Sequence, residues 1–242
     1  MAADGTVARL LGDAPLLSVG ILTADLAHLR DELRQLEQAG IAMVHTDVMD
    51  GVFCPMLTVG APFVAAQRTS LLKDVHLMID EPLDKVGAFV KAGADMITFQ
   101  VESARNPHRV LQVLGDAANA NDPSRGILRG IAVSPGTPLE VLPPLLDELD
   151  YVMLLAINPG WGGQRFVTAT EGRLRRVREL VAASGRRLVV GVDGGITKAN
   201  VAAVAAMGPD VIVTGSAVFD GTPETAANAT FMRSQLGARA AG

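Results

Sequence analysis

The sequence is poor in cysteine, aromatic residues and lysine, and it has no long apolar run. Its single cysteine, Cys54, excludes an intrachain disulfide and suits a reducing compartment. Aromatic residues make up 4% of the chain and the formal net charge is -5, which argues against a nucleic-acid-binding module. No segment approaches the roughly 20 apolar residues that cross a bilayer. We therefore expect a cytoplasmic protein that binds neither nucleic acid nor membrane.

The chain is rich in small aliphatic residues, and its length suits a globular domain. Hydrophobic residues make up 49% of the 242 positions and charged residues only 19%. Asp4, Arg9 and Asp13 interrupt the N-terminus, so no signal peptide is predicted there. We expect residues 1–14 to be a flexible N-terminal extension and residues 15–242 to form the folded domain.

A repeating rhythm of helix, glycine and apolar strand runs through that domain. Thr23 is predicted to cap a helix over 24–38, which ends at Gly40 before a strand over 41–47. The same order of predicted helix, glycine and apolar strand recurs at Gly93 and Gly208. Further helices are predicted near 61–70, 81–91, 107–116, 138–148, 170–183, 197–206 and 223–236. The remaining strands are predicted over 16–22, 74–77, 96–99, 130–133, 151–157, 188–192 and 211–214.

Eight apolar strands, each followed by a helix, indicate an α/β protein with a parallel sheet whose outer face is covered. Eight such units in fewer than 250 residues favour a single (β/α)8 TIM barrel. An open doubly wound sheet stays possible, because strand order cannot be read from the sequence.

Polar side chains follow three of these strands, at the end where barrel enzymes carry their active sites. His45 and Asp47 are two residues apart, so they lie on the same face of a strand. With His76 and Asp193 they form a candidate divalent-metal site, suited to zinc, iron(II), manganese or cobalt. Two structural alternatives stay open: Asp193 as a helix cap and His76 as a core histidine bonded to a carbonyl.

Glycines follow the later strands, where such barrels often bind a phosphate with main-chain N–H groups. Ordinary tight turns are the alternative explanation. The candidate phosphate- and substrate-binding residues are Gly160, Trp161, Gly162, Gly163, Gly194, Gly195, Gly215 and Ser216.

The scarcity of lysine narrows the reaction type. Lys73, Lys85, Lys91 and Lys198 all lie away from the predicted strand ends, which disfavours a Schiff-base aldolase. A metal at one end of the pocket and a phosphate at the other point to metal-assisted proton transfer beside the carbonyl of a phosphorylated substrate.

Five motifs, in order and at suitable spacing over about residues 16–235, resemble the ribulose-phosphate 3-epimerase family. They are Val44-His-Thr-Asp-Val-Met-Asp-Gly, Asp74-Val-His-Leu-Met, Asn158-Pro-Gly-Trp-Gly-Gly-Gln, Val192-Asp-Gly-Gly and Gly215-Ser-Ala-Val-Phe.

The resemblance implies an isomerase of the pentose phosphate pathway. It would invert C3 of a ketose phosphate, with D-ribulose 5-phosphate and D-xylulose 5-phosphate as the expected pair. By the same resemblance, His45, Asp47, His76 and Asp193 would bind one divalent metal ion. Asp47 and Asp193 would also be the acid and base on opposite faces of the substrate, working through a metal-stabilised ene-diolate. Assembly into a homo-oligomer is implied as well.

The resemblance also places Met49 and Met78 beside the reacting carbons.

The chain departs from the family pattern at four positions. Gly20 stands where a serine is usual, Met56 where an asparagine is usual, and Gln100 where a histidine is usual. Leu155 stands where a further methionine is expected. The changes leave two alternatives: an epimerase acting on another tetrulose, pentulose or hexulose phosphate, or a barrel that binds a sugar phosphate without catalysis.

Overall fold

Eight short strands form a closed parallel barrel in which each strand pairs with the next along the chain and the last pairs with the first. The structure is a computed structural model that describes residues 4–237. The closed order confirms the (β/α)8 barrel over the open sheet. The strands are β1 (Leu16–Gly20), β2 (Met43–Met49), β3 (Leu72–Met78), β4 (Met96–Gln100), β5 (Leu128–Val133), β6 (Tyr151–Leu155), β7 (Val189–Asp193) and β8 (Val211–Thr214).

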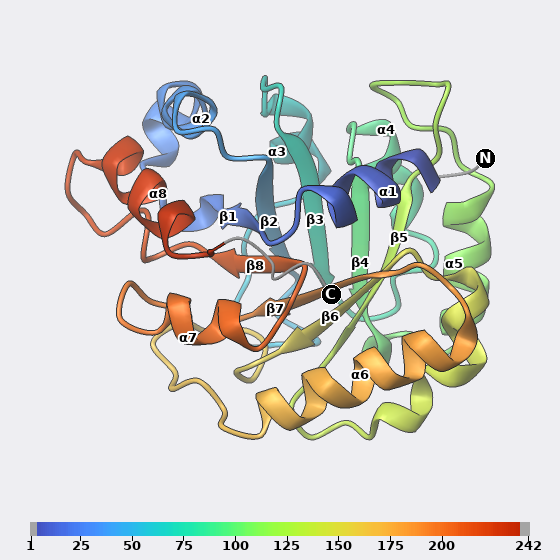
Figure 1. Ribbon diagram of the computed structural model, residues 1–242. Coiled ribbons are helices and arrows are strands. Elements are labelled where there is room, and N and C mark those ends of the chain that lie inside the picture. The colour runs from blue at the N-terminus through green and yellow to red at the C-terminus, as the bar shows by residue number, and fades with distance from the viewer. Residues whose placement is uncertain (1–3, 238–242) are drawn as a thin grey trace.

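Helices surround the barrel on its outer side (Figure 1). Within residues 4–237, no helix is long and apolar enough to span a membrane. The α-helices are α1 (Asp4–Gly12), α2 (Leu29–Gln38), α3 (Ala61–Ala66), α4 (Val86–Lys91), α5 (Pro107–Gly115), α6 (Thr170–Ser184), α7 (Val201–Ala206) and α8 (Thr225–Ser234). The 3-10 helices are η1 (Ile21–Thr23), η2 (Leu26–His28), η3 (Val101–Ser103), η4 (Leu139–Val141) and η5 (Pro143–Glu148).

Successive side chains of each strand alternate between the helices and the barrel interior. Val44 and Val75 are completely buried in the apolar layers between the strands and the helices. Met43, Met96 and Tyr151 belong instead to the cluster inside the barrel. Because both faces are buried, the strands are rich in apolar residues. Buried polar side chains such as Ser18, His45 and Asp74 lie among them.

The predicted helix stops are confirmed. Gly40, Gly93 and Gly208 follow α2, α4 and α7 with φ values of 69°, 86° and 82°. This left-handed conformation suits glycine, which has no Cβ, and it turns the chain from the helix into the next strand.

Two predicted helices have a different structure. Residues 139–148 form two 3-10 helices, because Pro143 and Pro144 lack the N–H groups that a continuous α-helix needs. Thr23 does not cap a helix over 24–38, because it ends the 3-10 helix η1. Asp25 instead caps the 3-10 helix η2 and accepts a hydrogen bond from the N–H of Ala27. The regular helix α2 therefore starts only at Leu29.

The N-terminal segment also differs from the predicted extension. Residues 4–12 form α1, and its Val7 and Leu10 are buried in the same cluster as the side chains inside the barrel. Burying each of these side chains stabilises the fold by about 1.5–3 kcal/mol. Helix α1 thus closes the end of the barrel opposite the polar strand ends, and residues 1–3 lie outside the described part.

Candidate active site

The alternation of β2, β3 and β7 brings the four predicted metal ligands together. His45 and Asp47 both point into the barrel, while Val44 and Val48, which flank them along the strand, pack outward. Asp47 pairs with His76 across β2 and β3. Closure of the barrel then carries β7 to the opposite side of the same opening, where Asp193 ends the strand.

The ligand atoms of His45, Asp47, His76 and Asp193 all lie within 4.8 Å of one another. Oδ1 of Asp47 is 3.1 Å from Nε2 of His45 and 3.0 Å from Nδ1 of His76. Nδ1 of His76 is 3.9 Å from Oδ2 of Asp193. Two imidazole nitrogens and two carboxylates form a donor set that fits zinc, iron(II), manganese or cobalt. The group could hold one divalent ion.

A buried carboxylate orients one of these histidines. Oδ2 of Asp74 lies 2.7 Å from Nδ1 of His45 and also accepts a hydrogen bond of 2.8 Å from the hydroxyl of Ser18. An ionised carboxylate only accepts hydrogen bonds, so Asp74 holds a proton on Nδ1 of His45. The other ring nitrogen, Nε2, faces Asp47, another of the predicted metal ligands. Such a carboxylate–histidine pair is a common support of metal ligands.

The pKa values of Asp47 and Asp193 are shifted from the ordinary aspartate value in opposite directions. Burial by itself would raise the pKa of Asp47, but the imidazoles of His45 and His76 lower it well below the usual range. Burial, together with the negative charge of Asp47, raises the pKa of Asp193 to about 6. Burial disfavours charged His45, yet the carboxylates of Asp74 and Asp47 outweigh it and raise its pKa well above normal. Two neighbouring carboxyl groups set apart in this way suit acid–base chemistry.

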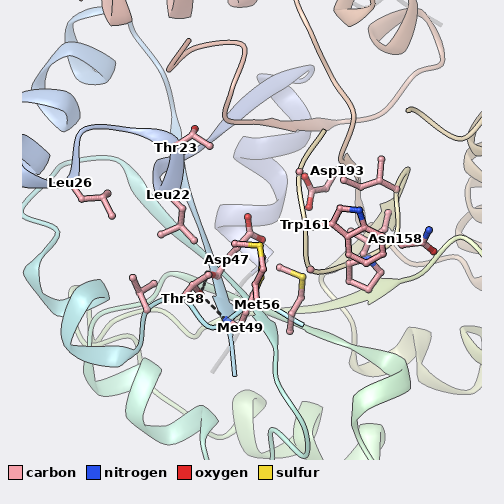
Figure 2. Close-up of a pocket in the computed structure, with 17 residues that line it drawn as sticks. Leu22, Thr23, Leu26, Asp47, Met49, Met56, Thr58, Asn158, Trp161 and Asp193 are labelled. Carbon is pink, nitrogen blue, oxygen red and sulfur yellow. Dashed lines mark hydrogen bonds between the residues drawn. The ribbon is translucent and has the colours of Figure 1, made fainter. Parts of the chain in front are cut away.

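Two adjoining cavities open at this end of the barrel. The larger has a volume of about 420 Å³ and a mostly apolar wall that includes Met49, Met78 and Leu155. Figure 2 shows Asp47 and Asp193 pointing into it beside Met49, Met56 and Trp161. The smaller cavity has a volume of about 210 Å³. Both are lined by Leu22, Thr23, Asp47, Ile157, Gly162 and Asp193.

The predicted glycine-rich binding residues divide between these cavities. Gly160 and Trp161 line the larger one, and Gly162 lines both. The smaller one is lined by Gly163, Gly194, Gly195, Gly215 and Ser216. The smaller cavity is therefore the glycine-lined end of the opening.

Close packing also accounts for several of these glycines. A Cβ on Gly194 would lie 2.4 Å from Cγ1 of Ile157, and one on Gly215 would lie 2.9 Å from the carbonyl oxygen of Gly20. Glycine lets the loops after β7 and β8 pack this closely.

The four departures from the family pattern lie in different places. Met56 and Leu155 line the larger cavity, and Gly20 lines the smaller one. Gln100 is completely buried and lines neither of them, and its side chain contacts His76. Three departures thus face the space available to a substrate, and the fourth lies behind a predicted metal ligand.

Sequence reasoning missed two supports of the site. Thr58 accepts a hydrogen bond from the N–H of Met49 and donates one to the carbonyl oxygen of Asp47, which ties the loop after β2 back to that strand. Asp74 supports His45, as described above. Its spacing of two residues from His76 is a signal that both side chains point inward, whereas no local pattern identifies Thr58.

Comparisons with known proteins point to one family. The model of the "Ribulose-phosphate 3 epimerase family" matches residues 16–219. The chain is 38% identical over 202 residues to the ribulose-phosphate 3-epimerase of Bacillus subtilis, covering 82% of this chain and 89% of that protein. It is 41% identical over 216 residues to the enzyme of the same name from Rhodobacter capsulatus, covering 86% and 89%.

A solved structure with a similar fold is that of KGPDC from Streptococcus mutans, with a TM-score of 0.66 and 13% identity. It covers 93% of this chain and 98% of that one. At this identity the likeness concerns the fold alone. The family match and the level of identity to the curated relatives are decisive: the chain belongs to the ribulose-phosphate 3-epimerase family of isomerases.

Proposed function

We propose that the protein inverts C3 of a ketose phosphate, with D-ribulose 5-phosphate and D-xylulose 5-phosphate as the expected pair. The observation that carries this proposal is the position of Asp47 and Asp193. Their carboxylates come from β2 and β7, line one cavity and adjoin two buried histidines. Membership of the family supports a phosphorylated sugar as substrate.

One divalent ion would be held by His45, Asp47, His76 and Asp193. When bound, it supplies a Lewis acid that polarises the substrate's carbonyl and stabilises the negative charge that develops during proton removal. The identity of the ion is open among zinc, iron(II), manganese and cobalt, all of which accept this donor set.

Proton transfer falls to the two aspartates. One removes the proton from C3, and the other delivers a proton to the opposite face, which inverts the carbon. Each well-placed acid or base contributes roughly 10²–10⁴-fold to the rate. The thioethers of Met49 and Met78 line the cavity beside them, where their apolar surfaces would exclude water from the reacting carbons.

The phosphate would occupy the smaller cavity. Main-chain N–H groups of Gly194, Gly195, Gly215 and Ser216 are the donors available to it there. Glycine permits a close approach of the backbone to an anion, so this end needs no arginine. The sugar would then extend from this cavity toward Asp47 and Asp193, which line both cavities.

Single substitutions of the aspartates test the proposal. Asp193→Asn and Asp47→Asn should each lower epimerisation at least 10²-fold while circular dichroism shows a folded barrel. Solvent deuterium should still enter C3 of one epimer, because the remaining carboxylate serves one face. Asp31→Asn, at a helix position whose side chain is 67% exposed, is the matched control. Wild-type turnover in Asp193→Asn would refute the assignment.

A second candidate is an epimerase that acts on a different ketose phosphate. Met56 puts a thioether where an amide is usual in the resembled pattern, and Gly20 leaves out a hydroxyl, both on cavity walls. Assays with tetrulose, pentulose and hexulose phosphates would separate the candidates. A barrel that binds sugar phosphate without catalysis would exchange no C3 proton for deuterium. Assembly into a homo-oligomer stays a prediction that a sedimentation measurement can test.

A further inference from the structure

The buried amide of Gln100 holds the ring nitrogen of His76 that points away from the predicted metal. Nε2 of Gln100 lies 3.1 Å from Nε2 of His76. The other ring nitrogen, Nδ1, faces Asp47 at 3.0 Å and Asp193 at 3.9 Å. Any ion shared by these residues is therefore bound by Nδ1 of His76, and the protonation of Nε2 decides whether Nδ1 has a free lone pair.

His45 and His76 differ in what holds the second nitrogen. Behind His45 is the carboxylate of Asp74, which accepts a hydrogen bond when ionised and so favours a proton on Nδ1 of His45 both with and without the metal. Behind His76 is a neutral amide, which can donate through its NH2 group or accept through its oxygen. The hydrogen-bond partner of His76 can therefore act as donor or acceptor, whereas that of His45 acts only as acceptor.

In the arrangement seen, the NH2 group of Gln100 faces Nε2 of His76. Nε2 must then accept the hydrogen bond, so the proton of the neutral ring is on Nδ1 and is donated to Oδ1 of Asp47. A ring in this tautomer is well hydrogen-bonded but cannot bind a cation through Nδ1.

Metal binding requires the opposite tautomer, with the proton on Nε2. Two donors would then face each other, unless the Gln100 amide makes a half-turn that presents its oxygen to His76. The NH2 group would move toward Ser134, whose Oγ lies 3.5 Å from Oε1 of Gln100. A hydroxyl can accept as well as donate, so both orientations of the amide have partners. Ser134 is held in place by a 2.8 Å hydrogen bond from its N–H to Oε1 of Glu102.

We propose that Gln100 is a positioning residue whose amide reverses with the tautomer of His76, so that this ligand is hydrogen-bonded both with and without the metal. The proposal rests on the metal site proposed above. One proton leaves Nδ1 and one is taken up on Nε2, so the ring stays neutral. Gln100 does not touch the substrate cavities, and it acts only through His76.

Nitrogen-15 NMR of the histidine rings tests the reversal in the wild-type protein. With a chelator present, His76 should carry its proton on Nδ1. After loading with zinc, the proton should be on Nε2. His45 is the internal control, since Asp74 should keep its Nδ1 protonated in both samples. A proton on Nε2 of His76 in the chelated sample would overturn the proposal, and absence of zinc binding would overturn the metal site itself.

Substitutions test the consequence for metal affinity, measured by competition with a chromophoric chelator. Gln100→Met keeps the length of the side chain but cannot accept from Nε2–H, and zinc affinity should fall roughly 10–100-fold. Gln100→His, which places a ring nitrogen able to donate or accept at this position, should have most of the wild-type affinity. Ser103→Ala is the matched control, because the Ser103 hydroxyl bonds only the main-chain oxygen of Gln100. Unchanged affinity in a folded Gln100→Met protein would contradict the proposal, and the NMR result stands if that variant does not fold.

Discussion

Nδ1 of His45 and Oδ2 of Asp74 are 2.7 Å apart, and both side chains are completely buried. The carboxylate fixes which nitrogen of His45 faces Asp47. Asp74 lies two residues before His76 on the same strand, so one segment of β3 supplies both a predicted ligand and the support of another.

Asp74→Asn should therefore weaken metal binding. An amide can donate to Nδ1 of His45 and stabilise the tautomer whose proton is on Nε2, the nitrogen needed by the metal. We expect zinc affinity to fall roughly 10–100-fold, measured by chelator competition. Ser18→Ala, which removes only the hydroxyl that donates to the same carboxylate, should have a smaller effect. Equal affinities in Asp74→Asn and wild type would show that the carboxylate does not orient the ligand.

Removal of metal should make stability depend on pH through Asp193. Burial and the charge of Asp47 raise its pKa to about 6, above the value of about 3.9 in unfolded chains. The folded state is thus favoured while Asp193 is protonated, fully so below about pH 4, and this contribution is lost as the pH rises through about 6. Urea unfolding with chelator present should show the loss in wild type and not in Asp193→Asn. Parallel pH profiles for the two proteins would contradict the shift.

Met56→Asn should change which ketose phosphate is preferred. Met56 lines the larger cavity, and an amide there offers a hydrogen bond to a substrate hydroxyl in an otherwise apolar wall. We expect about a tenfold gain in kcat/KM for pentulose over tetrulose phosphate, in line with roughly 1.4 kcal/mol for one hydrogen bond. The neighbouring Leu57 is 77% exposed and does not line that cavity. Leu57→Asn should leave the ratio unchanged, and an unchanged ratio in Met56→Asn would exclude this role.

Gly191→Ala should strongly destabilise the barrel. A Cβ on Gly191 would lie 2.0 Å from the hydroxyl of Tyr151, a side chain that fills the barrel interior. We expect a loss of about 3 kcal/mol in the free energy of unfolding, measured with urea. Tyr151→Leu in the same chain should restore part of that loss by removing the clashing ring. A double variant no more stable than Gly191→Ala would mean that the clash is relieved elsewhere.

Much of the fold could be predicted from local pattern. Gly40, Gly93 and Gly208 end helices as their positions before apolar strands indicate, because the left-handed turn they adopt favours glycine. The two-residue spacing of His45 and Asp47 places both inside the barrel, since side chains alternate along a strand. Predictions that depend on a single cap or on helix propensity were wrong in two places. Asp25, not Thr23, has a capping side chain before the helical residues that follow β1. Because Pro143 and Pro144 lack N–H groups, 3-10 helices form where an α-helix was predicted over 138–148.

The repeating α/β units, the inward face of each strand and the polar residues at the strand ends could be read from the amino-acid pattern, because they follow from periodicity and backbone sterics. The structure was needed to give the distances within the predicted group of His45, Asp47, His76 and Asp193. It was also needed to show that Gln100 lies behind His76 and that α1 closes the far end of the barrel. These contacts join strands and helices distant along the chain, so they depend on the closure and register of the whole sheet.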